Sequence, residues 1–341
     1  MFLSIDLTPK ERTHWAKQVT TWQTRLGDWS IRTVFDAPLA AIHEGWDDVT
    51  LQHILQGTAK EGDLPSYAPV LIHARLTVLE QREQVQEYLR LAKATGQTRE
   101  YVTMLVRQGQ IAEAVDYGFQ HLATAEDTLA LAQELTAHGE HSHSLQIADH
   151  GLTLEGNHVP LAVWLRDQSW SMGEQMLALK AGEMAFHDEP TLKHYLRVAE
   201  IAGTDWPEQR SKLLDIARQA PWSADPQGLV RIFLHEHLFD DAIAVLKTKQ
   251  PYTLVAQVVE AALKEQTALE WVIQECHQQA EHIMNGAKAA YYQGAALWLT
   301  RARSAYHMLG QREEWDAYLD DLLERHKYKS KLLPLLTALK E

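Results

Sequence analysis

Apolar residues recur three and four positions apart along most of this chain, which is the spacing that one buried face of an α-helix requires. Tyr101, Met104 and Leu105 show this spacing clearly. Helix starts carry capping residues, such as Thr8 followed by Glu11 three positions later. No stretch shows the sustained alternation of β-branched residues that is typical of a strand. The sequence therefore predicts an all-α protein.

The helical pattern is interrupted at nearly regular distances by glycines. Gly109, Gly139 and Gly173 each stand between two helical segments, at separations of 30 and 34 residues. A small residue follows each glycine five positions later, where it would let the second helix of a hairpin pack closely on the first. These small residues are Ala114, Ser144 and Ala178.

The third unit reproduces the spacing of a tetratricopeptide repeat from its inter-helix turn, at Gly173, to its closing proline, Pro190. Gly182 stands where that repeat has an aromatic residue. Short units that bury their apolar faces only by stacking favour a tetratricopeptide-like helical-hairpin solenoid, a superhelical array. The alternative is an irregular helical bundle with glycines at chance positions. The register continues at Gly203 and His237, although Glu208 breaks the small-residue rule.

The segment from Gln56 to Ser66 combines glycine, proline and charge, and we interpret it as a linker. It would separate an N-terminal helical segment, residues 1–60, from a helical-repeat array, residues 65–341. No basic region with a following apolar run opens the chain, and no uncharged apolar run approaches the ~20 residues that span a bilayer. We therefore expect a cytoplasmic protein that makes no membrane contact.

Three stretches, residues 37–48, about 98–190 and 309–333, resemble the C-terminal helical-repeat region of bacterial SWIM-type zinc-finger proteins. The most characteristic piece is Leu309-Gly-Gln-Arg-Glu-Glu-Trp-Asp-Ala-Tyr318. The finger that names this family needs a Cys-x-Cys pair followed by Cys-x-His. Cys276 is the only cysteine, so the resemblance implies the helical part without its finger. Nucleic-acid binding by the finger therefore carries over to no residue here.

Composition and motifs exclude several kinds of chemistry. The formal net charge is −14, which argues against direct nucleic-acid binding by phosphate neutralisation. The chain lacks the nucleophile-elbow, phosphate-loop and His-Glu-x-x-His patterns. His141 and His143 lie two apart, so on a helix they would point away from each other rather than share a metal. We expect no metal, no cofactor and no enzymatic activity, with a site that has no motif as the remaining enzymatic alternative.

Tryptophan is unusually frequent, and Trp15, Trp22 and Trp29 recur every seven residues, which indicates one helix face. The repeat register places Trp170 on the first, inner helix of its hairpin, where a solenoid lines its concave groove. Packing between neighbouring repeats is the alternative role for it. The register also places four polar residues on this face: Arg99, Thr103, Gln133 and Asp167. The alternative to a binding role is that the face is an ordinary solvated helix surface.

These observations favour a non-enzymatic scaffold that binds a protein partner through its concave face. The alternative is a nucleic-acid-associated accessory domain of a SWIM zinc-finger protein. A basic cluster near the end, which also suits the C-terminal dipole of a helix, is the one local feature an anion could contact. It comprises Arg325, Lys327, Lys329 and Lys331.

Overall fold

The computed structural model describes residues 2–4, 7–26, 32–43, 45–47, 49–56, 68–221, 223–247, 251–286 and 288–340. Within these ranges the chain is all-α, and the extended pairing is limited to one bridge between Thr124 and Glu155. The all-α part of the predicted fold class is thereby confirmed. Trp29 and, apart from Gln56, the expected linker lie outside the described residues.

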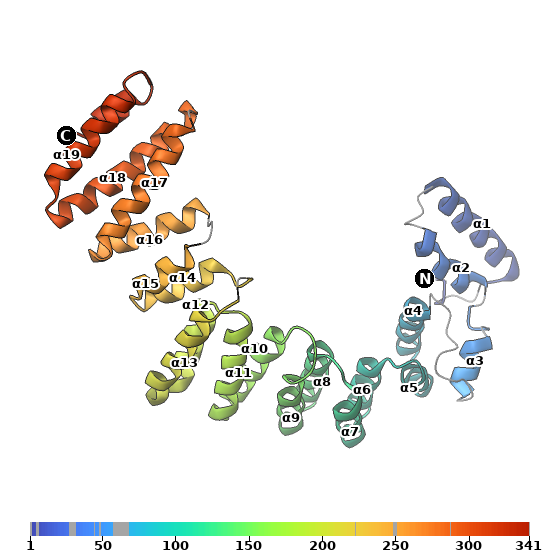
Figure 1. The fold of residues 1–341 in the computed structure, drawn as a ribbon. Helices are drawn as coiled ribbons and strands as arrows, with labels where there is room; N and C mark the ends of the chain where they lie inside the picture. The colour runs from blue at the N-terminus through green and yellow to red at the C-terminus, as the bar shows by residue number, and fades with distance from the viewer. Residues whose placement is uncertain are drawn as a thin grey trace. The chain divides into compact units, whose positions relative to one another are not determined.

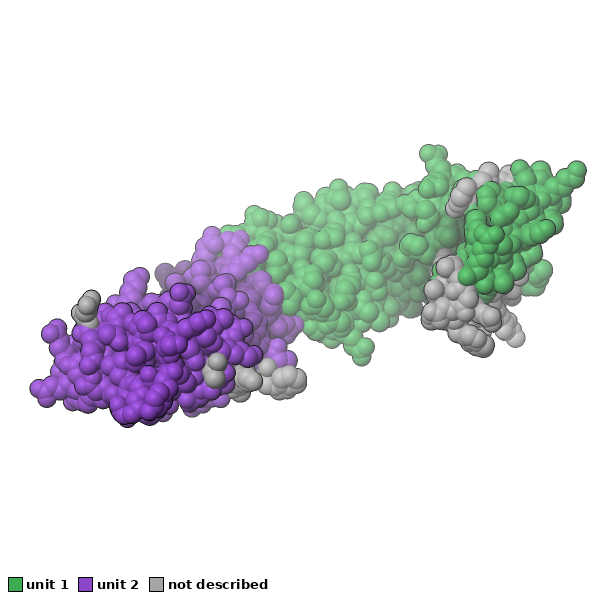
Figure 2. All heavy atoms as spheres, turned by 90° about the horizontal axis from the view of Figure 1, so that it is seen from above, with its two compact units in different colours: residues 1–181 green, residues 182–341 purple. Residues whose placement is uncertain are grey.

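The chain divides into two compact units, Met1–Ala181 and Gly182–Glu341 (Figure 2). The first contains α1 (Pro9–Leu26), α2 (Arg32–His43), α3 (Val49–Gln56), α4 (Ala68–Gln81), α5 (Val85–Ala94), α6 (Thr98–Arg107), α7 (Ile111–His121), α8 (Ala125–Ala137), α9 (His141–Gly151) and α10 (Val159–Ser171). Helix α11 (Gln175–Asp188) spans the division. The second contains α12 (Leu192–Ala202), α13 (Trp206–Arg218), α14 (Pro226–His235), α15 (Phe239–Val245), α16 (Tyr252–Glu265), α17 (Leu269–Asn285), α18 (Tyr292–Leu309), α19 (Arg312–Arg325) and α20 (Leu333–Thr337).

The glycines of the repeat register form the turns that were expected of them. Gly109, Gly139 and Gly173 follow α6, α8 and α10 with φ of 74°, 81° and 81°. Such left-handed backbone favours glycine because it has no Cβ. The next N–H then bonds back to a carbonyl five residues earlier, at 2.9 Å in each case, which is the Schellman pattern. The pairs are Gln110–Leu105, Glu140–Leu135 and Glu174–Ser169.

Two further hairpins have the same turn without a glycine. Glu83, between α4 and α5, and His237, between α14 and α15, each have φ of 56°. Gly203 behaves differently, because a short 3-10 turn, η2 (Gly203–Asp205), joins α12 to α13. This different turn accompanies the break in the small-residue rule at Glu208. The predicted small residues of the other units are buried, each with at most 1% exposure: Ala114, Ser144, Ala178 and Ala242.

Neighbouring hairpins stack with like helices in contact. In the first unit α6 packs on α8 and α8 on α10, and α7 packs on α9 (Figure 1). Arg107 of α6 links three hairpins, since its guanidinium lies 2.6 Å from Glu80 of α4 and 3.1 Å from Glu134 of α8. In the second unit α12, α14, α16 and α18 contact one another in succession. None of the described helices is long and apolar enough to cross a bilayer.

The helices from α16 to α20 enclose an aromatic core. Trp298 and Trp315 are almost fully buried there, together with Cys276. Burial raises the pKa of the Cys276 thiol to about 12, so the thiol stays protonated. His277, its neighbour in α17, stacks on Tyr318 of α19 with ring centroids 3.7 Å apart. Burial lowers the pKa of His277 to about 4, with a smaller opposing effect from Glu281.

Replacing Glu83 with glycine should stabilise the first unit. Glycine occupies left-handed backbone without the steric cost of a Cβ, so we expect Glu83→Gly to raise the free energy of unfolding by about 0.5–1 kcal/mol. Gly109→Ala should lower it by about 1 kcal/mol for the opposite reason. Glu87→Gly, in the first turn of α5, is the matched control and should be destabilising. Urea unfolding measures all three, and a destabilised Glu83→Gly protein would contradict the assignment.

Acidification should weaken the packing of α17 on α19. An unfolded histidine takes up a proton near pH 6.5, whereas folded His277 resists protonation until about pH 4. The unfolded state therefore binds more protons in this window, and stability falls as the pH drops from about 6.5 to 4. We expect the melting temperature of the natural chain to fall more steeply than that of His277→Gln. If the melting temperatures of the two proteins fell equally steeply with pH, His277 would not be responsible for the loss of stability.

Candidate functional site

The predicted partner-binding residues lie on three neighbouring helices of the first unit. Arg99 and Thr103 belong to α6, Gln133 to α8, and Asp167 and Trp170 to α10. Each of these helices opens its hairpin, and each packs on the next. Arg99, Gln133 and Trp170 are exposed, whereas Thr103 and Asp167 are half-buried. We call the solvent-exposed side of α6, α8 and α10 that carries these five residues the first-helix face.

Thr103 and Asp167 make hydrogen bonds within their own helices. The Thr103 hydroxyl donates to the backbone carbonyl of Arg99, one turn earlier, at 2.8 Å. Asp167 accepts hydrogen bonds from Nε and Nη2 of Arg166 at 2.9 and 3.0 Å. Arg166 is only 3% exposed, and a buried guanidinium needs a counter-charge. Asp167 therefore holds a buried cation in place. Arg99, Gln133 and Trp170 are the better contact residues because they are the exposed members of the five.

An exposed apolar group surrounds the turn between α10 and α11. Trp170 is 37% exposed, Met172 in the turn is 43% exposed, and Met176 at the start of α11 is 86% exposed. Methionine is flexible and polarizable, and it adapts to the shape of a partner. Sequence reasoning singled out Trp170 but missed the two methionines. Their positions on either side of Gly173 are the signal that could have found them.

The stretch from α7 to the middle of α10 is acidic and rich in histidine. Between Arg107 and Arg166 the sequence has eight carboxylates and six histidines but no lysine or arginine. His143 lies 3.0 Å from the Glu140 carboxylate, so this histidine is engaged locally. Among the residues that the structure describes, no group of three or more His, Cys, Asp or Glu side chains is arranged to hold a metal.

Buried tyrosines tie neighbouring helices together. The hydroxyl of Tyr195 in α12 donates to Glu236, just after α14, at 2.8 Å, and Arg210 of α13 binds the same carboxylate. The pKa of Tyr195 is raised above its ordinary value, mainly by burial and to a smaller extent by the hydrogen bond to the Glu236 carboxylate. The Tyr101 hydroxyl donates to Glu113 in the same way, at 2.8 Å. Because these tyrosines stay protonated, the two clusters join helices and supply no reactive phenolate.

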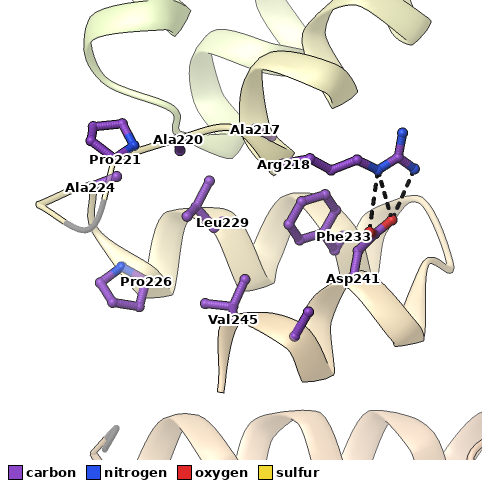
Figure 3. Close-up of a pocket in the computed structure, with 11 residues that line it drawn as sticks. Ala217, Arg218, Ala220, Pro221, Ala224, Pro226, Leu229, Phe233, Asp241 and Val245 are labelled. Atoms are coloured by element: carbon purple, nitrogen blue, oxygen red, sulfur yellow. Dashed lines mark hydrogen bonds and ion pairs between the residues drawn. The ribbon is translucent and has the colours of Figure 1, made fainter. Parts of the chain in front are cut away.

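A cavity of about 410 Å³ lies in the second unit, beside the connection between α13 and α14 (Figure 3). Leu229 and Phe233 of α14 and Val245 of α15 give it an apolar wall. Four of the described positions around this space carry alanine, whose small side chains leave room between the helices. These positions are Ala217, Ala220, Ala224 and Ala244.

An ion pair lies at one end of this cavity (Figure 3). Arg218 donates to Asp241 through Nε at 3.2 Å and through Nη2 at 2.9 Å. Its Nη1 donates to Asp215 at 3.1 Å. These contacts, with the hydrogen bond to Asp241 first, raise the pKa of Arg218, which is charged at any physiological pH. Sequence reasoning did not find the cavity.

Removing the counter-charge of Arg166 should destabilise the first unit. Asp167→Ala leaves a buried guanidinium without its bidentate partner, and we expect a loss of about 2 kcal/mol in unfolding free energy. Asp116→Ala, at an exposed position of α7, is the control and should change stability by less than about 0.5 kcal/mol. Chemical denaturation measures both. Equal effects from the two substitutions would show that Asp167 is an ordinary surface residue.

The scan against protein-family models found no match to this chain, and the search of curated proteins found none either. The likeness to SWIM-type proteins therefore stays a prediction from the residues quoted for it.

Proposed function

We propose that the chain is a non-enzymatic, cytoplasmic scaffold of the tetratricopeptide-like solenoid type, which binds a protein partner across the first-helix face as its concave surface. The observation that carries this proposal is the row formed by α6, α8 and α10. These helices pack side by side, and each leaves an exposed strip with a different polar or aromatic residue. Such a row is the binding surface that stacked hairpins create.

The residues on this face suit protein recognition. Tryptophan and arginine are the side chains that most often dominate the binding energy of an interface. Trp170 and Arg99 supply one of each, at opposite ends of the row, and Met172 extends the apolar contact around Trp170. Asp167 contributes indirectly, because it holds Arg166 within the helix that carries Trp170.

The resemblance to the helical part of SWIM-type proteins agrees with this proposal. It covers residues 98–190, which include the whole first-helix face, and it implies a helical-repeat region apart from the finger. A nucleic-acid-associated function finds less support, because two of the four residues in the basic cluster near the end are paired with acidic side chains. Arg325 pairs with Asp321 and Glu281, and Lys327 pairs with Glu324.

Truncating both ends of the row should abolish partner binding without unfolding the protein. We expect Arg99→Ala combined with Trp170→Ala to reduce recovery of the partner at least about tenfold, because two interface anchors are lost. Affinity purification from the native host with quantitative mass spectrometry measures recovery. The melting temperature should change little, since both side chains are exposed.

Phe119→Ala is the matched control, because Phe119 is also 37% exposed but lies on α7, outside the first-helix face. The partner is the protein that is recovered equally well with this control and with the natural chain but is lost with the double variant. Equal recovery by all three proteins would overturn the assignment of the first-helix face.

A further inference from the structure

The cavity at the Arg218–Asp241 ion pair has a neighbour. A second cavity, of about 220 Å³, shares Pro226 with the first and is lined on its other sides by α14 and by the start of α16. We propose that the two cavities form a docking site for an extended, basic segment of a partner protein, which places one apolar side chain in each. This site lies in the second unit and is independent of the first-helix face.

The interior of the larger cavity fits an apolar side chain. Its volume of about 410 Å³ falls in the range of ligand-binding clefts, and its walls are mainly alanine, proline, leucine, valine and phenylalanine. Filling such a space removes apolar surface from water on both partners. Leu229 and Phe233 are themselves buried, so this wall of the cavity is well packed.

The pairing of the cavities indicates an extended chain as the occupant. Side chains two positions apart on an extended segment project to the same side, roughly 7 Å from each other. Adjoining cavities on either side of Pro226 suit such a pair. The smaller cavity also offers Gln227, Thr253 and Gln257, whose side chains can donate to and accept from the main chain of the segment.

The charges around the two cavities favour a basic segment. Among the described lining residues Arg218 is the cation, and Asp241 and Asp225 are the anions. Asp225 accepts from the N–H groups of Gln227 and Gly228 at the start of α14. Asp215, which also binds Arg218, adds a third carboxylate. In α15 and just after it, Asp240 and Lys247 offset each other. The excess of carboxylates attracts a partner that carries lysine or arginine beside its apolar residues.

Short labelled peptides test the proposal with the full chain. The probe is a capped, fluorescein-labelled Arg-Leu-Ser-Leu-Arg peptide, compared with Glu-Leu-Ser-Leu-Glu and Arg-Ala-Ser-Ala-Arg, with fluorescence anisotropy as the measurement. We expect the basic leucine peptide to bind at least about tenfold more tightly than either comparison peptide. No saturable binding of it below about 1 mM would overturn the proposal, as would equal binding of all three.

Variants that fill the cavities locate the binding. Ala244→Leu should obstruct the larger cavity and Thr253→Leu the smaller, and both positions are exposed, so the fold should be retained. Each should weaken binding of the basic leucine peptide at least about fivefold. Ala112→Leu, at an exposed position of α7 in the first unit, is the control and should leave the affinity unchanged.

Three further outcomes are decisive. Binding that survives both cavity substitutions places the peptide elsewhere and overturns the proposal. Self-association of the natural chain that Ala244→Leu abolishes, seen by sedimentation, assigns the site to a second copy and also overturns it. Loss of peptide binding in Trp170→Ala would place the peptide on the first-helix face and overturn the proposal. Unchanged peptide binding by Trp170→Ala would show that the two-cavity site is separate from the first-helix face.

Discussion

The left-handed turn that follows the first helix is the constraint on which the hairpins depend. A single residue with positive φ lets the following N–H bond back into the helix, so the chain reverses within about three residues. The second helix then has no freedom to move away from the first. Five positions after the turn the residue is alanine or serine in the hairpins that begin with α6, α8, α10 and α14, whereas it is Tyr88 in the hairpin that turns at Glu83. A small residue at this position lets the two helices of a hairpin pack closely, and the row formed by α6, α8 and α10 follows from stacking three such hairpins.

Sequence reasoning found this turn at the three regularly spaced glycines and missed it at Glu83, where glycine is absent. Gly109, Gly139 and Gly173 were recognisable because glycine tolerates positive φ, and His237 was reached through the register alone. Glu83 has the same conformation, but its residue type gives no signal and it precedes the units that the register identified. Helix faces were predictable for a related reason, since a period of 3.6 residues determines which side chains share a side.

The parts of the site that escaped prediction depend on side-chain geometry and tertiary contacts. Neighbouring residues on a helix point in different directions, so nothing in the sequence indicates that Asp167 holds Arg166. The cavity beside α14 is lined by residues from three helices and a loop, and its alanines and prolines have no chemical signature. The described alanines that border it meet only in the folded unit.

The lack of lysine and arginine between Arg107 and Arg166 affects how the first unit can be mapped. Trypsin cleaves after these two residue types, so it releases α7, α8, α9 and most of α10 as one peptide of 59 residues. Lysine-directed cross-linkers have no attachment point in the same stretch. Footprinting of Gln133, in the middle helix of the row, therefore requires a protease that cleaves at the aspartates and glutamates of this stretch. Cross-linking of the stretch requires reagents that react with carboxylates.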